Sequence, residues 1–161
     1  MGLDLDNMRI DGEQKDGKSF FEEVGGYPTL KKVHKIFYDK VFKHPWLSKF
    51  FRDKSQDHLE DQQTDFMAGL FGGPKKYCGR FPREAHMHIN VTEELFDLRH
   101  RILETAILEA GLSEEHAKEW LRLDGSFRRA VVKRSPDLCK KRWVQDEILD
   151  FENPVAPKKA G

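Results

Sequence analysis

One histidine, His86, stands in a sequence context that suits a chemical role. Two glycines, Gly72 and Gly73, end the helix before it, because they adopt backbone angles that residues with a Cβ avoid. Pro82 fits the first turn of a new short helix, which places His86 one turn further on and on the same inward face as Ile89. An imidazole on an apolar face needs a partner. His86 is therefore either a core histidine bonded to a carbonyl oxygen or a ligand of iron.

Two further polar side chains interrupt stretches that are otherwise apolar. Tyr38 lies between Phe37 and Val41 in a predicted helix, so its hydroxyl is expected to point inward, where a buried phenol needs a hydrogen-bond partner. Gln63 follows Leu59 at helical spacing, and burying an unpaired amide costs on the order of 1–3 kcal/mol. Gln63 therefore bonds to the backbone, or sits at the edge of its apolar stripe, or faces the same ligand as Tyr38.

The elements that must position these side chains are all helices. Apolar residues recur at spacings of three and four along most of the chain, and no segment alternates as a strand does. Ser19 and Ser113 are predicted N-caps. The helices that we expect cover residues 19–24, 27–42, 46–51, 55–70, 82–86, 92–110 and 114–134.

The length of the chain fits one domain. Its 161 residues are enough to bury a substantial core. We expect a flexible or loosely docked N-terminal extension over residues 1–18 and a helical domain over residues 19–135. A C-terminal extension over residues 136–161 contains a short amphipathic piece around Trp143. Neither extension carries much of the apolar pattern that builds the domain.

Charge, hydropathy and cysteine spacing argue against nucleic-acid binders, membrane proteins and disulfide-bonded or zinc-binding proteins. Lys plus Arg and Asp plus Glu both total 28, and this zero net charge argues against a nucleic-acid or anionic-membrane binder. No apolar run is long enough to cross a bilayer and the N-terminus is polar, so we expect a cytoplasmic protein without membrane insertion. Cys78 and Cys139 are far apart, which predicts reduced thiols. His86 and His88 form only a weak zinc pattern, because no cysteine pair or carboxylate stands at ligand spacing.

The run GGPKKYCGRFPREAH, followed by a short spacer and Leu-Phe, resembles the segment between the E and G helices of the group I truncated haemoglobins. These globins place one Gly-Gly pair between their first two helices and another after the E helix, which the pairs at 25–26 and 72–73 match. The resemblance covers roughly residues 19 to 134. It implies an all-α, two-over-two helical sandwich that encloses haem b, iron protoporphyrin IX.

The resemblance also assigns roles to single residues. His86 matches the proximal histidine that ligates the haem iron in the family, whereas His88 does not match it. Tyr38 matches the distal tyrosine of the B helix, and Gln63 is expected to act with it on the bound gas. The other expected haem contacts are Phe51, Leu59, Gln62, Phe66 and Phe96, with Lys75, Tyr77 and Arg80 as candidates around the propionates.

Two positions mark a departure from the family and an alternative to it. Arg99, one turn after Leu95, falls where the family usually has a small apolar residue near the haem. His58 is next to Leu59, the residue that matches the distal E-helix position. If the helix predicted over residues 55–70 were rotated by one residue, His58 would point at the iron and give a bis-histidine haem.

The resemblance implies a small haem globin that binds O₂, CO and NO. The reaction it favours is NO dioxygenation, which yields nitrate and needs an unidentified external reductase. The alternatives are a haem-based ligand sensor, a six-coordinate electron-transfer globin and a haem-free helical interaction module. We expect a monomer or weak dimer, and removal of residues 1–18 and 136–161 should keep haem binding and O₂ affinity within a few-fold.

Overall fold

The computed structural model describes residues 17–155, and the expectations for residues 1–16 and 156–161 lie outside them. The described residues form helices and no strand, which confirms the all-α prediction. These helices are α1 (Phe20–Val24), α2 (Gly26–Lys43), η2 (Leu47–Phe51), α3 (Gln56–Leu70), α4 (Pro82–His86), α5 (Glu93–Glu109), α6 (Glu114–Gly125), α7 (Arg128–Val131) and η3 (Pro136–Leu138). None of them is both long and apolar enough to span a membrane.

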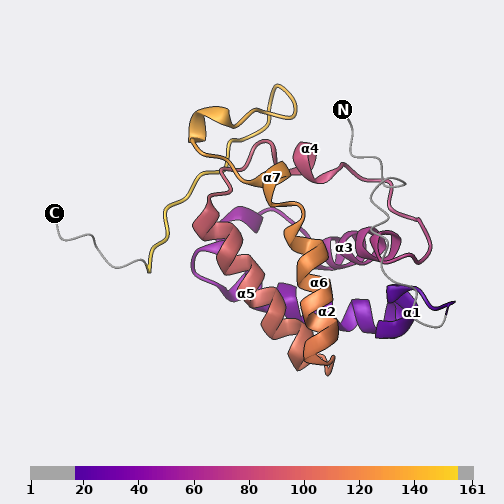
Figure 1. Cartoon of the computed structure of the whole chain (residues 1–161). Helices are drawn as coiled ribbons and strands as arrows, with labels where there is room; N and C mark the ends of the chain where they lie inside the picture. The colour runs from indigo at the N-terminus through magenta and orange to yellow at the C-terminus, as the bar shows by residue number, and fades with distance from the viewer. Residues whose placement is uncertain (1–16, 156–161) are drawn as a thin grey trace.

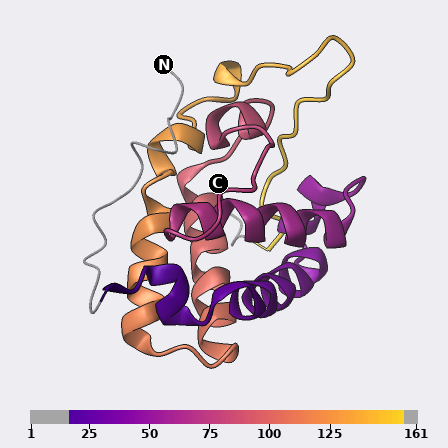
Figure 2. The ribbon, with the colours of Figure 1, turned by 90° about the vertical axis from the view of Figure 1, so that its right-hand side faces the viewer.

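The long helices form two crossed layers. Figures 1 and 2 show α2 beside α3 and α5 beside α6, with the first pair lying across the second. Leu30 of α2, Ile107 of α5 and Trp120 of α6 are fully buried between the layers. A hydrogen bond of 2.8 Å between His34 Nδ1 and Thr64 Oγ1 joins α2 to α3 inside the core. This arrangement is the expected two-over-two sandwich.

Side-chain caps fix where the helices begin. Ser19 and Ser113, the two predicted N-caps, accept hydrogen bonds from the N–H groups of Glu22 and His116. One helix differs from its expectation. The helix predicted over residues 114–134 is broken into α6 and α7, because the Ser126 hydroxyl and N–H both bond to the carbonyl of Leu123 and the last turn of α6 tightens.

Beyond η3, the chain runs back along the molecule as an extended segment, residues 139–153, called here the C-terminal segment (yellow in Figure 1). The N–H of Lys140 donates to the carbonyl of Met87 at 2.8 Å. Leu149 forms an isolated parallel bridge beside Ile89. The indole N–H of Trp46 donates to the carbonyl of Phe151 at 2.6 Å. The C-terminal segment therefore packs on the helical domain at both ends.

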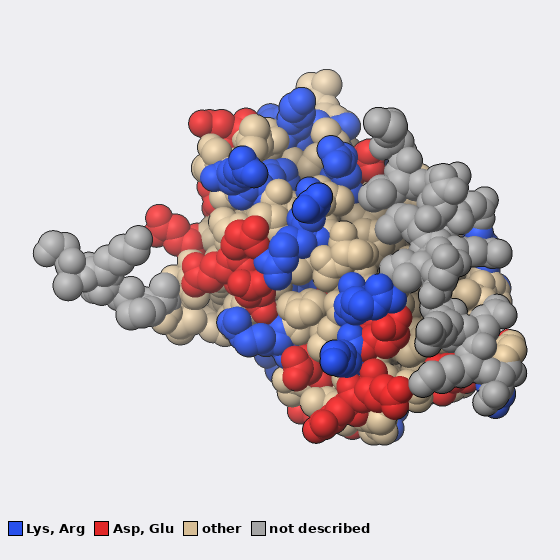
Figure 3. All heavy atoms as spheres, viewed as in Figure 1, with Lys and Arg blue, Asp and Glu red and all other residues tan. Residues whose placement is uncertain are grey.

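Charges of both signs are interspersed on the face of the molecule shown in Figure 3. The ion pair between Arg99 and Asp124, which joins α5 to α6, is instead largely internal. Arg99 Nη1 lies 2.7 Å from Oδ2 of Asp124, whose side chain is buried. Burial alone would raise the pKa of Asp124, but the Arg99 guanidinium and the bond to His100 outweigh it and lower the pKa to about 2. Asp124 therefore stays ionised inside the protein.

The Phe-Gly-Gly turn after α3 packs directly on α1. The N–H of Phe21 donates to the carbonyl of Phe71 at 3.0 Å, and the N–H of Gly73 donates back to Ala68 at 2.8 Å. A Cβ at position 73 would lie 2.6 Å from Cγ of Phe21. Only glycine fits there, because the base of the Phe21 ring cannot swing aside as the end of a flexible chain could.

We predict that Gly73→Ala lowers the free energy of unfolding by about 1–3 kcal/mol, the usual cost of overpacking. Gly69→Ala is the matched control, because a Cβ there meets only ordinary contacts at 3.8 Å and beyond, inside α3. That change should be neutral or stabilising by up to about 1 kcal/mol. Urea unfolding of both variants checks this, and equal stabilities would contradict the tight contact at Gly73.

Arg99→Met should destabilise the fold by roughly 3–5 kcal/mol, because it leaves a buried carboxylate without its main partner. The exposed pair Lys40–Glu109, 2.9 Å apart, provides the control, and Lys40→Met should cost less than about 1 kcal/mol. In a double-mutant cycle, Arg99→Met with Asp124→Leu should be more stable than Arg99→Met alone. A double variant that is less stable than Arg99→Met would contradict the pairing.

Candidate functional site

A cavity of about 580 Å³ lies between α3 and α4, with α5 and α7 at its inner end. This volume is within the range of cofactor and ligand sites in proteins. Most of the side chains that sequence reasoning selected line it. They are Tyr38, Phe51, Leu59, Gln62, Gln63, Phe66, Tyr77, Arg80, His86 and Phe96. Lys75 is the exception, because it is exposed and does not belong to the cavity wall.

His86 faces the cavity from the end of α4. Its Nδ1 lies 2.7 Å from the carbonyl oxygen of Pro82. A carbonyl oxygen only accepts hydrogen bonds, so Nδ1 carries the proton and Nε2 keeps a free lone pair. Burial lowers the pKa of His86 to about 4, although the bond to Pro82 acts in the opposite direction. The two alternatives for this histidine are therefore compatible, since it bonds to a carbonyl and still offers a nitrogen for a metal.

Lys133 fixes the end of α4. Its Nζ donates to the carbonyl oxygen of His86, the last residue of α4, at 2.8 Å and to that of Ile89, in the turn that follows, at 2.6 Å. Pro82 begins the same helix, where its missing N–H has no cost. Pro82 therefore determines where α4 begins, and Lys133 stabilises the end of the helix, where His86 lies.

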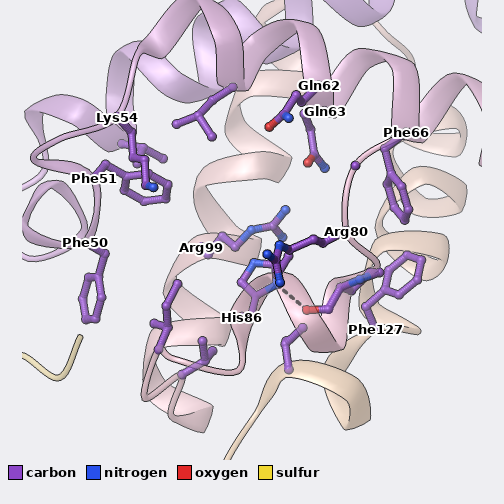
Figure 4. Close-up of a pocket in the computed structure, with 18 of the residues that line it drawn as sticks. Phe50, Phe51, Lys54, Gln62, Gln63, Phe66, Arg80, His86, Arg99 and Phe127 are labelled. Carbon is purple, nitrogen blue, oxygen red and sulfur yellow. Dashed lines mark hydrogen bonds between the residues drawn. The ribbon is translucent and has the colours of Figure 1, made fainter. Parts of the chain in front are cut away.

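The opposite wall of the cavity comes from α2 and α3. Figure 4 shows Gln63 on α3 extending into the cavity toward His86 on α4. Tyr38 of α2 also lines the cavity, and its side chain is buried against the rings of Phe37 and Phe51. Burial raises the pKa of Tyr38 to about 12, so its hydroxyl keeps its proton and can donate.

Aromatic rings form much of the remaining wall. Phe66 packs against Tyr77 and Phe127 with ring centroids 5.1 and 5.4 Å away. The hydroxyl of Tyr77 donates to the backbone carbonyl of Arg80, so it stabilises the loop between α3 and α4. Phe96 of α5 is buried under the guanidinium of Arg128. The cavity is therefore lined mainly by apolar groups, with few polar ones.

The structure also locates Arg99, which departs from the family pattern, and His58, the alternative iron ligand. Arg99 lines the inner end of the cavity, where Asp124 binds it and the ring of Phe37 lies 5.3 Å from its guanidinium carbon. A partner on α6 thus explains a charge at this position. His58 is exposed and lies at the cavity wall beside Leu59.

Several side chains of the cavity wall were not among the predicted site residues, and four of them are polar or aromatic groups near its opening or near His86. Lys54 follows η2, and His88 is almost fully buried just beyond α4, where its Nδ1 has no hydrogen-bond partner among the described residues. Arg142 and Trp143 belong to the C-terminal segment. Trp143 belongs to an amphipathic piece of the sequence, but nothing local indicates that it reaches the cavity.

These residues fit a haem group. A neutral histidine with a free Nε2 is the usual proximal ligand of globin haem iron, and aromatic and aliphatic walls suit the porphyrin faces. A zinc site has less support, since the described residues contain no cluster of three His, Cys, Asp or Glu side chains that could hold a metal ion.

Comparisons with known proteins agree with this geometry. The family model of the bacterial-like globins matches residues 19–132. The group 1 truncated hemoglobin of Tetrahymena pyriformis is 33% identical over 115 residues, which cover 71% of this chain and 95% of that protein. A group 1 truncated hemoglobin of Synechocystis is 28% identical over 112 residues, covering 67% of this chain and 90% of that protein.

The solved structures that resemble this chain include truncated hemoglobins as well. The Fe(III) form of the Tetrahymena pyriformis truncated hemoglobin superposes with a TM-score of 0.66 and 28% identity, covering 73% of this chain and all of that one. A 2/2 hemoglobin of a Synechococcus species, crystallised in the cyanomet state with covalently attached heme, also gives 0.66, with 26% identity. The chain therefore belongs to the bacterial-like globin family and has the two-over-two fold of the group 1 truncated hemoglobins.

Proposed function

We propose that this globin holds haem b through His86 and reversibly binds O₂, with CO and NO as further ligands. The observation that carries the proposal is the hydrogen bond from His86 Nδ1–H to Pro82, because it leaves Nε2 unprotonated at the cavity. The family implies haem binding, and the polar side chains opposite His86 support a gas ligand on that side.

The haem supplies an iron centre that binds diatomic gases, and the protein's side chains determine how well each gas is held. The lowered pKa of His86, about 4, keeps the imidazole neutral at physiological pH, which ligation requires. Tyr38 keeps its hydroxyl proton and serves as the donor to the gas. Gln63 adds an amide donor from the facing helix.

We further propose NO dioxygenation as the reaction, with an external reductase supplying electrons and with the cytoplasm as its site. Its support is the pair of uncharged polar groups, Tyr38 and Gln63, that α2 and α3 contribute to the cavity wall. The second candidate is electron transfer by a six-coordinate haem, and its support is the presence of His58 at the cavity wall.

We predict that His86→Ala abolishes stable haem binding, or leaves a haem protein whose Soret band is restored by added imidazole. His88→Ala should leave the position of the Soret band unchanged, because His88 is not the ligand. Absorption spectra of the purified variants check this. The opposite pattern would refute the assignment of His86, and a wild-type chain without a Soret band would instead support a haem-free helical module.

Tyr38→Phe should speed O₂ release by one order of magnitude or more, since a strong hydrogen bond is worth roughly 1.5–3 kcal/mol and each 1.4 kcal/mol is about tenfold. CO is less polar, so its release should change far less. Gln63→Leu should act in the same direction, and the two changes should be non-additive because neighbours in one network couple. Leu59→Ala should alter ligand entry more than retention.

Stopped-flow measurement of O₂ and CO dissociation tests these expectations on all three variants. Wild-type O₂ release in both Tyr38→Phe and Gln63→Leu would refute the role of the polar pair. The case for the electron-transfer alternative would then be examined with His58→Ala, which changes the ferrous spectrum only if His58 ligates the iron.

A further inference from the structure

The C-terminal segment connects the two sides of the cavity. Near its end, Leu149 donates from its N–H to the carbonyl of His88 at 2.9 Å and accepts from the N–H of Asn90 at 2.8 Å, directly after the helix that carries His86. Two residues later, the ring of Phe151 packs against Phe50 of η2 with centroids 5.1 Å apart. The segment thus joins the His86 side of the cavity to the η2 side.

Between Lys140 and Leu149, the segment contributes Arg142 and Trp143 to the cavity wall. The Trp143 ring lies close to two guanidinium groups, with Arg142 at 4.2 Å and Arg80 at 5.5 Å from its centroid. Figure 4 shows Arg80 and Lys54 at the same cavity, the first from the loop before α4 and the second from the residues after η2. Three separate parts of the chain therefore bring cationic side chains to one opening.

Arg142 is held in place by a carboxylate. Its Nε and Nη2 donate to the two oxygens of Asp146 at 2.8 and 2.9 Å, and its backbone N–H donates to the same group at 2.9 Å. Asp146 is itself buried. No described residue accepts a hydrogen bond from Nη1, so two N–H groups of this planar cation are available for another acceptor.

The charge at the cavity wall is unbalanced. Its cationic side chains are Lys54, Arg80, Arg99 and Arg142, and its single carboxylate, Asp124, is already bonded to Arg99 at the inner end. Such an opening suits a ligand with an apolar body and carboxylate groups at one edge, which is the chemical form of haem. Guanidinium groups bind carboxylates more strongly and with better geometry than any other side chain does.

We propose that Arg142 and Trp143 are part of the haem-binding site, with the Arg142 guanidinium bonded to a haem carboxylate and the Trp143 indole covering the adjoining haem edge. The inference rests on the proposed haem function. The match to the globin family ends at residue 132, so this part of the site belongs to the chain's own extension. A haem contact from Arg142 and Trp143 differs from the expectation that residues 136–161 can be removed at little cost to haem binding.

Haem loss from the reconstituted full-length chain tests the proposal. The transfer of haem to excess apomyoglobin is followed at the Soret band, with iron protoporphyrin IX and with its dimethyl ester, in which both carboxylates are masked. Arg142→Gln should release haem at least tenfold faster than wild type, the factor that corresponds to about 1.4 kcal/mol. With the dimethyl ester, Arg142→Gln and wild type should release the ligand at similar rates.

Two neighbours in the segment provide matched controls. Lys141→Gln removes the same charge next to Arg142 from an exposed residue outside the cavity wall, and it should leave haem loss at the wild-type rate. Trp143→Ala should speed loss of both haem and ester at least threefold, since its contact is apolar. Val144→Ala, at a side chain 91% exposed, should change neither rate.

The outcomes separate the contact from a general weakening of the fold. Equal acceleration of haem and ester loss in Arg142→Gln would refute the carboxylate contact, and wild-type rates in both Arg142→Gln and Trp143→Ala would refute the whole proposal. If Arg142→Gln does not fold, Arg142→Lys replaces it and should give an intermediate rate with haem only. A wild-type chain that takes up no haem would overturn the proposed function as well.

Discussion

The hydrogen bond between His86 Nδ1–H and the carbonyl of Pro82 is the interaction on which the rest of the site depends. It joins residues four apart in the short helix α4, so the backbone that carries the histidine also orients its ring. Because the carbonyl can only accept, the bond selects one tautomer and leaves the other nitrogen basic. A bond of this kind to a metal-binding histidine also raises its strength as a ligand.

The surroundings of His86 maintain its neutral form. Burial is the main reason for its low pKa, and three cations, Arg99, Lys133 and Arg142, add to it. Each of these cations has another role as well. Arg99 pairs with Asp124, Lys133 bonds to the carbonyls at the end of α4, and Arg142 is clamped by Asp146. These three cations thus act together on one imidazole, although they come from distant parts of the chain.

Apolar spacing and helix caps were enough to predict most of the helices, whereas the expectation that Tyr38, Gln63 and His86 share one site came from the resemblance to the truncated haemoglobins. Pro82 begins α4 as its position predicts, and Tyr38 and Gln63, which interrupt apolar stripes, both line the cavity. Sequence patterns did not predict features that depend on a partner far away in the chain. The charge of Arg99 is explained only by Asp124, 25 residues away. The break after α6 arises from the hydroxyl of Ser126, which competes for a backbone carbonyl without any change in apolar spacing.

The placement of the C-terminal segment has a consequence for the order in which the protein is built. Its contact with Trp46 spans 105 residues, and those with residues 87–90 span about 60, so they form only after most of the domain has been synthesised. Contacts this distant in sequence close large loops and form slowly. A nascent chain that ends near residue 132 therefore contains the sequence of α1 to α7, with His86, but still lacks Arg142 and Trp143 of the cavity wall.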